Sequence, residues 1–197
     1  MSEDKNSVVV AEMIARARAA MTEVENYDQA RIDSLCQALA WATGNEKTFK
    51  RLAIRSVDES GIGDREGRVN KRFKIYGVLR DALRQKSVGI VEELPEKGIV
   101  KYAKPAGVIA SLVPMTNPEL TPPVTGVYAM KARDAVIFSP HPRTAARHRR
   151  HDRGQQPGAQ PLQAHQLSRG AALPVAPTLR GGAARRVLPD PARHLYP

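Results

Sequence analysis

The hydrophobic periodicity of this chain changes after Gly89, and this change limits the folds that the sequence can adopt. Residues 1–88 place apolar side chains three and four positions apart, the spacing of helix faces. After Gly89, the segments GIVEEL, GIVKYA and GVIASLV are short, rich in β-branched residues and bounded by glycine or proline, which is typical of strands. The sequence therefore predicts an α/β chain in which helices come first and a sheet follows.

Three amphipathic helices are expected before residue 61. The second follows Asn26 and Gln29, which have the spacing of a capping box, and it ends at Gly44. The third covers residues 45–60, with Gly61 near its C-terminal cap. The inward faces of the three helices are predicted from Val10, Met13, Ile14, Ala17, Met21 and Val24; from Ile32, Leu35, Cys36 and Leu39; and from Phe49, Leu52, Ala53 and Val57.

A fourth helix is predicted to have one apolar and one basic face. The apolar face consists of Val69, Phe73, Tyr76, Leu79 and Leu83, and the basic face of Arg68, Lys71, Arg72, Lys74, Arg80 and Arg84. We interpret the basic face as a solvated outer surface. No aromatic residues are expected among the basic ones on the exposed side for base stacking, so a nucleic-acid patch is disfavoured.

A strand, a helix and a second strand are predicted between residues 107 and 138. Residues 107–113 are almost all apolar, as in a central parallel strand buried on both faces, residues 118–133 can form a helix, and residues 135–138 form the second strand. A right-handed crossover places the loop after Val113 at the carboxyl edge of the sheet. This edge is where α/β proteins bind nucleotides and substrates.

Residues 144–197 have a different composition from the rest of the chain. They contain nine Arg, two Asp and no Lys or Glu, so they contribute 9 − 2 = +7 of the formal net charge of +11. Seven prolines interrupt any helical period, and disorder is expected. Translation of GC-rich DNA in a shifted frame, beginning near residues 143–147, explains this composition. The alternatives are an arginine-rich tail that binds nucleic-acid phosphates and a genuine extension.

The sequence is thus divided into a helical part (1–88), a β-rich segment with the first βαβ unit (89–143) and a basic tail (144–197). One cysteine, Cys36, allows no intramolecular disulfide and no CxxC motif, which fits the cytoplasm. No metal site is expected. The first apolar run is short and interrupted by Glu12 and Arg16, so neither a signal peptide nor a membrane span is predicted.

Residues 105–118, PAGVIASLVPMTNP, are an apolar strand that ends in a proline-bounded polar loop. This stretch resembles the aldehyde dehydrogenase superfamily, whose acylating branch typically carries Thr-Asn-Pro here. The resemblance implies that the side-chain amide of Asn117 helps to hold the substrate oxyanion, or that Thr116 does so if the register differs. A neutral N–H donor suits that role. Without the resemblance, Asn117 is better interpreted as the cap of a helix that starts near Glu119.

The second strand ends in Ser-Pro-His-Pro-Arg, residues 139–143. Acylating members similar to the aldehyde half of bifunctional aldehyde-alcohol dehydrogenases carry Ser-Pro-His-Pro here. The resemblance implies a Rossmann-like parallel sheet and binding of NAD or NADP; the cofactor-side residues are then Pro114, Thr116, Ser139, His141, Pro142 and Arg143. Taken alone, His141 is an imidazole in a rigid turn, and we assign it no acid–base role. The GxGxxG motif of ordinary Rossmann dehydrogenases is absent from the sequence.

In this family a cysteine thiolate attacks the aldehyde, a hydride passes to NAD(P), and coenzyme A takes the acyl group. Cys36 lies on the inward stripe of a helix and is interpreted as core packing, so the nucleophilic Cys is expected to be absent. The resemblance therefore implies an amino-terminal fragment of an acylating aldehyde dehydrogenase that is truncated and inactive.

Several alternatives remain open at this point. The chain could instead be a regulatory or nucleic-acid-binding protein with an arginine-rich tail, or a scaffold that assembles with full-length subunits. By resemblance the substrate is a small aldehyde, with a weak preference for sulfoacetaldehyde over acetaldehyde and other short aldehydes, and NAD is not distinguished from NADP. Intact family members are homo-oligomeric, and no membrane partner is expected.

Overall fold

The computed structural model describes residues 2–142; Arg143 and the expectations for residues 144–197 lie outside the described part. Six helices, four strands and one 3-10 turn follow one another in this part. The elements are α1 (Ser2–Val24), α2 (Gln29–Gly44), α3 (Glu46–Ser60), α4 (Arg65–Asn70), α5 (Phe73–Leu83), β1 (Ile90–Leu94), η1 (Pro95–Lys97), β2 (Ile99–Tyr102), β3 (Val108–Val113), α6 (Thr121–Ala132) and β4 (Ala135–Pro140). The predicted α/β class, with helices before the sheet, is confirmed.

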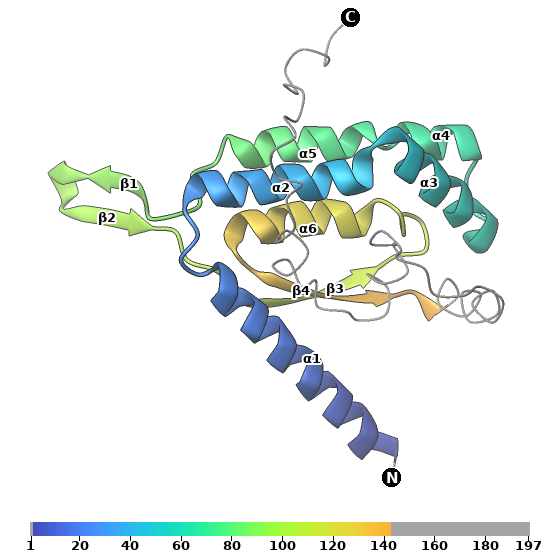
Figure 1. The fold of residues 1–197 in the computed structure, drawn as a ribbon, viewed down its shortest axis with the longest axis horizontal. Helices are drawn as coiled ribbons and strands as arrows, with labels where there is room; N and C mark the ends of the chain where they lie inside the picture. Colours follow the sequence, from blue (N-terminus) through green and yellow to red (C-terminus); the bar gives the residue numbers. More distant parts are fainter. Residues whose placement is uncertain (1, 143–197) are drawn as a thin grey trace, which may run out of the picture.

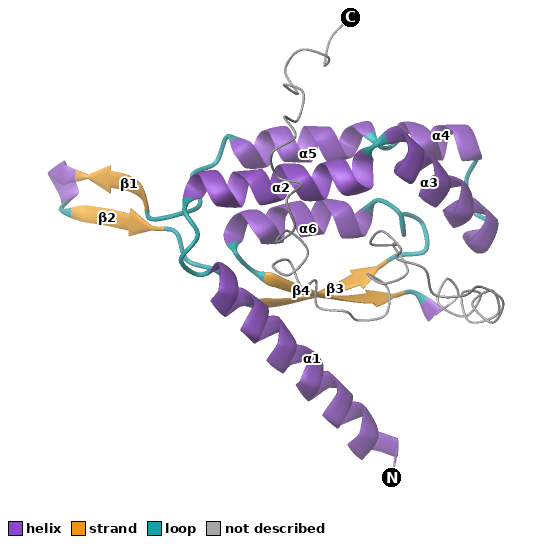
Figure 2. Cartoon of the chain, viewed as in Figure 1, coloured by secondary structure: helices purple, strands orange, loops and turns teal. Residues whose placement is uncertain are grey.

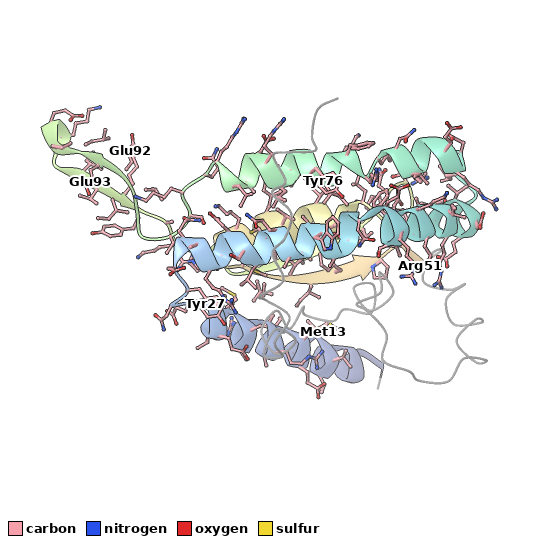
Figure 3. The ribbon with its side chains drawn as sticks, turned by 45° about the horizontal axis from the view of Figure 1, so that its top comes forward. Met13, Tyr27, Arg51, Tyr76, Glu92 and Glu93 are labelled. Carbon is pink, nitrogen blue, oxygen red and sulfur yellow. The ribbon has the colours of Figure 1, made fainter. Side chains whose placement is uncertain are left out.

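Helices α2, α5 and α6 pack against one another on one side of the β3–β4 sheet, and α1 crosses its other side (Figure 1). Strands β1 and β2 form an antiparallel hairpin that projects away from these layers (Figure 2). Figure 3 shows Glu92 and Glu93 on this hairpin, far from Tyr76 in the helical layer. No helix of residues 2–142 is long and apolar enough to cross a membrane.

The main core lies between the helices. Ile32, Cys36, Phe49 and Ala53 are fully buried, and Leu35 is 5% exposed, so the inward faces predicted for α2 and α3 are confirmed. Asn45 caps α3 by accepting from Thr48 N, and Gly61 ends this helix in the left-handed conformation (φ 69°).

The prediction for α1 is confirmed only toward its C-terminal end. Ala17 is fully buried and Val24 is 6% exposed, whereas Val10 is 52% exposed. The sheet that α1 crosses contacts only the later turns of the helix, through a small cluster of Ala17 with Ala135. An apolar face can be read from the sequence, but how much of it is covered depends on the partner element.

The capping box predicted for the second helix is wrong. Asp28 is the N-cap, and its side chain accepts a hydrogen bond from Arg31 N at 2.7 Å. Gln29 instead reaches across the fold, and its Oε1 accepts from Ser87 N (2.8 Å) and Val88 N (3.1 Å). These bonds fix the segment that leads into β1.

The fourth predicted helix is two helices, because the helical conformation is interrupted between Asn70, the last residue of α4, and Phe73, the first residue of α5. The break rotates the face that follows: Ile75 and Ala82 are buried, whereas Phe73, predicted to face inward, is 57% exposed. The prediction that Arg68 is solvated is also wrong, since this residue is only 3% exposed. Its guanidinium faces the nearby Ile62 carbonyl and two groups that lie far away in sequence, the Thr116 carbonyl and the Glu119 carboxylate.

Strands β3 and β4 are parallel neighbours, with Val108 opposite Ala135 and Val113 opposite Pro140. The predicted βαβ unit is therefore confirmed. The expectation that β3 is buried on both faces is wrong, since Leu112 is 80% exposed. Within residues 2–142 β3 pairs only with β4, and an apolar strand stays covered only where other elements lie against it.

Candidate functional site

The two sequence motifs lie side by side at the carboxyl edge of the β3–β4 sheet. Val113, the last residue of β3, is opposite Pro140 of β4, and its carbonyl accepts a hydrogen bond from His141 N at 3.1 Å. The loop that begins at Pro114 and the turn that contains His141 therefore leave the sheet from the same edge. This is the edge at which parallel α/β sheets bind ligands.

The loop between β3 and α6 is a compact turn. Asn117 N donates to Pro114 O at 3.4 Å, and Asn117 O accepts from Thr121 N at 3.0 Å. Helix α6 begins at Thr121, and its N-cap residue, Leu120, makes no side-chain capping bond. The interpretation of Asn117 as a side-chain cap is therefore wrong, since its main chain supports the start of the helix while its side chain points elsewhere.

The Asn117 carboxamide is held by a lysine from the helical layer. Lys71 Nζ donates to Asn117 Oδ1 at 2.6 Å, and Asn117 Nδ2 donates to Thr116 Oγ1 at a long 3.5 Å. The Asn117 side chain is half-buried and Thr116 is exposed. Both candidate oxyanion donors thus lie in the same turn, and the strong hydrogen bond is made by the acceptor atom of Asn117.

A buried ion pair anchors the same loop. The Arg68 guanidinium lies 3.4 Å from the Glu119 carboxylate, and the two side chains are 3% and 1% exposed. Arg68 also donates to the Thr116 carbonyl, and to the Ile62 carbonyl at 2.6 Å. A buried charge is tolerated where it is paired and hydrogen-bonded. Two of the Arg68 partners, Thr116 and Glu119, lie on either side of Asn117 in the sequence.

Sequence reasoning missed these supporting residues. Arg68 and Lys71 were both placed on a solvated basic face, and Glu119 was expected only as the start of a helix. The contacts join residues 46 to 51 positions apart, so a local pattern cannot predict them. One signal was available: Arg68 falls within a short, capped segment that opens with Asp64, whose Oδ1 accepts from Gly67 N at 2.6 Å.

The residues that the sequence predicts for the cofactor side lie on both halves of this edge. Ser139 is exposed and pairs in register with Leu112, His141 is half-buried, and Pro142 is exposed. Pro114 is exposed at the start of the facing loop. The structure thus brings Pro114, Thr116, Ser139, His141 and Pro142 to one edge of the sheet, while Arg143 lies outside the described residues.

Cys36 lies in the main core. It is fully buried in α2, and its Sγ lies 3.7 Å from the Val127 carbonyl of α6. Burial raises the pKa of Cys36 to about 12, although the nearby Lys131 ammonium acts in the opposite direction. A thiol of this kind is neither accessible nor ionised at neutral pH, so Cys36 packs the core as expected and is not a nucleophile.

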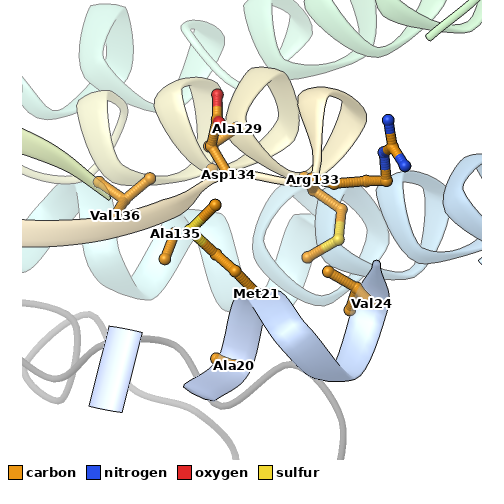
Figure 4. A pocket seen from close by; sticks show the side chains of 10 residues that line it. Ala20, Met21, Val24, Ala129, Arg133, Asp134, Ala135 and Val136 are labelled. Atoms are coloured by element: carbon orange, nitrogen blue, oxygen red, sulfur yellow. The ribbon is translucent and has the colours of Figure 1, made fainter. Parts of the chain in front are cut away.

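A largely apolar pocket lies at the opposite end of β4. Met21 and Val24 of α1 face Ala135 and Val136 across it, and Met130 of α6 completes the wall (Figure 4). It is distinct from the candidate site, which lies beyond Ser139 at the other end of this strand. Within residues 2–142, no three His, Cys, Asp or Glu side chains are grouped so that they could hold a metal ion.

Solved structures identify the class of this fold. An acetylating aldehyde dehydrogenase from Geobacillus thermoglucosidasius matches with a TM-score of 0.65 and 30% identity, over 81% of this chain and 40% of that one. A propionaldehyde dehydrogenase from Rhodopseudomonas palustris with bound CoA shares the fold with a TM-score of 0.53 and 23% identity, over 68% and 30% of the two chains. Residues 2–142 therefore contain the start of the aldehyde dehydrogenase fold.

Sequence relatives narrow the class to one branch. The chain is 41% identical over 136 residues to a sulfoacetaldehyde dehydrogenase from Acholeplasma sp, which covers 68% of this chain and 28% of the relative. It is 40% identical to the acylating sulfoacetaldehyde dehydrogenase of Bilophila wadsworthia (68% and 29%), and 36% identical to the acetylating succinate-semialdehyde dehydrogenase of Clostridium kluyveri (70% and 30%). Over about 70% of its length, this chain is homologous to the acylating aldehyde dehydrogenases.

The chain spans less than a third of the length of these relatives. No protein-family model matches it. The alternative of a nucleic-acid-binding or regulatory protein gains no support from these relatives.

Proposed function

We propose that residues 89–142 form the oxyanion side and one cofactor side of an acylating aldehyde dehydrogenase site. The reaction is aldehyde + CoA + NAD(P)⁺ to acyl-CoA + NAD(P)H + H⁺. One observation carries the proposal: β3 and β4 bring the Asn117 turn and the Ser139–Pro142 turn to the same edge of a parallel sheet, joined by the hydrogen bond from His141 N to Val113 O. The homology to acylating enzymes supports the same assignment.

In this proposal, Asn117 provides the hydrogen-bond donor. When a nucleophile adds to an aldehyde, negative charge develops on the carbonyl oxygen, and a preorganised neutral N–H stabilises that charge without losing a proton. Lys71 engages Oδ1 of Asn117, so Nδ2 carries two N–H groups toward other partners. Thr116 is the alternative donor, through a hydroxyl in the same turn.

The cofactor side is assigned to Pro114, Thr116, Ser139, His141 and Pro142, which bind NAD or NADP. The hydroxyl of exposed Ser139 offers a donor and an acceptor at the strand end. When bound, the cofactor accepts the hydride, and CoA accepts the acyl group. The residues on this edge bind and orient these molecules. Arg143 is kept as a cofactor-side candidate from the sequence alone.

The nucleophile of the family reaction is not provided by the residues of this sequence. The reaction needs a thiolate at the aldehyde carbon, and the one cysteine of the sequence, Cys36, is buried in the core with its pKa raised to about 12. We therefore propose that this chain alone does not complete the reaction. Purified chain incubated with NAD(P)⁺, CoA and a short aldehyde is expected to form no NAD(P)H, and measurable turnover would contradict this.

We propose sulfoacetaldehyde as the preferred aldehyde substrate, because two of the relatives are named for it. The name of a third indicates succinate semialdehyde. Cytoplasmic location is proposed from the single cysteine of the sequence, and assembly into homo-oligomers from the family resemblance.

For residues 144–197 we propose a shifted reading frame, on composition alone: nine Arg, no Lys and seven Pro in 54 residues. The test needs only the DNA that encodes and follows this segment. Translation in the other frames is expected to restore aldehyde dehydrogenase sequence containing a cysteine. If neither frame restores it, the segment is a genuine part of the protein and the proposal is wrong.

The test of the site itself is cofactor binding. Calorimetric titration of the chain with NAD⁺ and NADP⁺ is expected to show saturable binding to at least one. Ser139→Glu should weaken it about tenfold, or about 1.4 kcal/mol, because a carboxylate at the strand end repels the cofactor phosphates. Ser34→Glu, on the exposed side of α2, is the matched control. Equal affinities of the two variants would contradict the assignment of Ser139.

A further inference from the structure

A hydrogen bond from Lys71 Nζ to Asn117 Oδ1 links the helical layer to the side chain at the centre of the candidate site. It measures 2.6 Å and is partly buried, and its two residues are 46 positions apart in sequence. Lys71 directly follows α4, and its own main chain is held by the bond from Lys71 N to Arg68 O at 3.2 Å. The ammonium is therefore presented from a fixed part of the backbone.

A carboxamide can be placed in two orientations that differ by half a turn. An ammonium group carries only donors, so it can face the oxygen of the amide and not its NH₂ group. With Lys71 beside it, Asn117 is restricted to the orientation with Oδ1 toward the lysine. Within residues 2–142, Nδ2 then has one weak contact, at 3.5 Å to Thr116 Oγ1, so its N–H groups can be donated to a ligand.

The main chain on either side of Asn117 is fixed independently. Arg68 donates to the carbonyl of Thr116 and pairs with Glu119, both next to the turn, and its side chain is 3% exposed. Arg68 therefore sets where the turn lies, whereas Lys71 acts only on the side chain of Asn117. Arg68, which lies in α4, and Lys71, which caps this helix, therefore have separable effects on the turn and on the Asn117 side chain.

We propose that Lys71 is a positioning residue, which orients the Asn117 carboxamide so that its N–H donors face the aldehyde. This rests on the proposed role of Asn117 as the oxyanion donor. The hydrogen bond to a cation also polarises the amide, which makes its N–H groups better donors for developing negative charge. Lys71 acts through Asn117 and does not itself touch the aldehyde.

The side-chain NH₂ signal of Asn117 in the ¹⁵N-labelled full chain, assigned with Asn117→Asp, tests this proposal. In the unmodified chain its order parameter should exceed that of Asn70, an exposed asparagine. Lys71→Met should lower it to below about 0.6, the range of flexible groups, Lys71→Arg should largely restore it, and Lys74→Met, on an exposed lysine of α5, should leave it unchanged. An Asn117 amide as mobile as that of Asn70 in the unmodified chain would overturn the proposal even if a variant failed to fold.

Acetate, a carboxylate probe for the oxyanion, separates the two proposals. In the unmodified chain, acetate should shift the Asn117 NH₂ signal, and Lys71→Met should reduce that shift more than Lys71→Arg does. An amide that is ordered by Lys71 but does not respond to acetate contradicts the oxyanion role alone. An amide that responds equally in the unmodified chain and in Lys71→Met contradicts the positioning role alone.

Discussion

Replacing Arg68 by methionine is the most demanding test of the structure, because a surface arginine could be replaced at almost no cost. The guanidinium is 3% exposed and has three partners: the Glu119 carboxylate at 3.4 Å, the Ile62 carbonyl at 2.6 Å and the Thr116 carbonyl. Methionine fills most of the volume but leaves the Glu119 carboxylate, 1% exposed, without a cation. Removing one partner of a buried pair destabilises a protein by about 3–5 kcal/mol.

The assay is urea unfolding followed by circular dichroism, with thermal unfolding in parallel. A loss of this size should lower the unfolding temperature by about 10 °C, at roughly 2–4 °C per kcal/mol. Since the whole chain can have as little as about 5 kcal/mol of stability, Arg68→Lys is the second variant: it keeps the charge but not the fork of donors, and should lie between Arg68→Met and the unmodified chain.

Arg65→Met is the matched control on the same helix. Arg65 pairs with Asp58 at 2.7 Å, but its side chain is 64% exposed, so its loss should change stability by less than about 1 kcal/mol. The double variant Arg68→Met with Glu119→Gln should be more stable than the sum of the single changes predicts, because it removes the orphaned charge. If Arg68→Met and Arg65→Met have equal effects, the buried pair is not part of the folded protein.

Three further outcomes follow from single contacts. Cys36 should not react with a thiol reagent in the folded chain at neutral pH and should react fully in denaturant, because burial raises its pKa to about 12; rapid labelling without denaturant would contradict its place in the core. Asn45→Ala should destabilise the chain by about 1–2 kcal/mol in urea, because it removes the cap of α3 and the bond from Asn45 Nδ2 to Trp41 O at 2.9 Å; Asn70→Ala, at an exposed position, should have a smaller effect. Tyr76→Phe should lower the free energy of unfolding by about 0.5–1.5 kcal/mol, since the hydroxyl donates to Gly44 O at 2.7 Å; an unchanged unfolding midpoint would contradict this bond. A spectrophotometric titration should also find the Tyr76 pKa above its ordinary value, because burial disfavours the charged form.

The sequence was sufficient for those features that depend on local pattern. The helix faces of α2 and α3 were predicted from four apolar positions each, and the Gly61 cap from the residue that follows the last turn. The order strand, helix, strand from Gly107 onward followed from the position and length of the apolar segments. These predictions hold because a buried helix face and a left-handed C-cap need particular residue types at particular spacings.

Some errors involve contacts between distant parts of the chain, and others involve the residue at which a helix begins or ends. Asn26 and Gln29 fit a capping pattern, but Asp28 offers a carboxylate at the right position and Gln29 is used by residues 87 and 88. Phe73 fits a helical stripe, but the break after Asn70 rotates it toward solvent. A pattern states which face of a helix is apolar; it does not state where one helix ends and the next begins with a new orientation.

The same limit explains why the candidate site could be predicted only in part. The end of β3 and the turn that follows it are consecutive in sequence, so the motif around Asn117 could be recognised. The residues that hold the turn, Arg68 and Lys71, come from a helical segment that precedes the sheet and looked like a solvated basic face. Because Glu119 is buried against Arg68, residues 89–142 separated from the helices would leave this carboxylate without its cation. The turn that contains Asn117 therefore depends on the helical layer, and a variant in α4 can alter it without any change in residues 114–121.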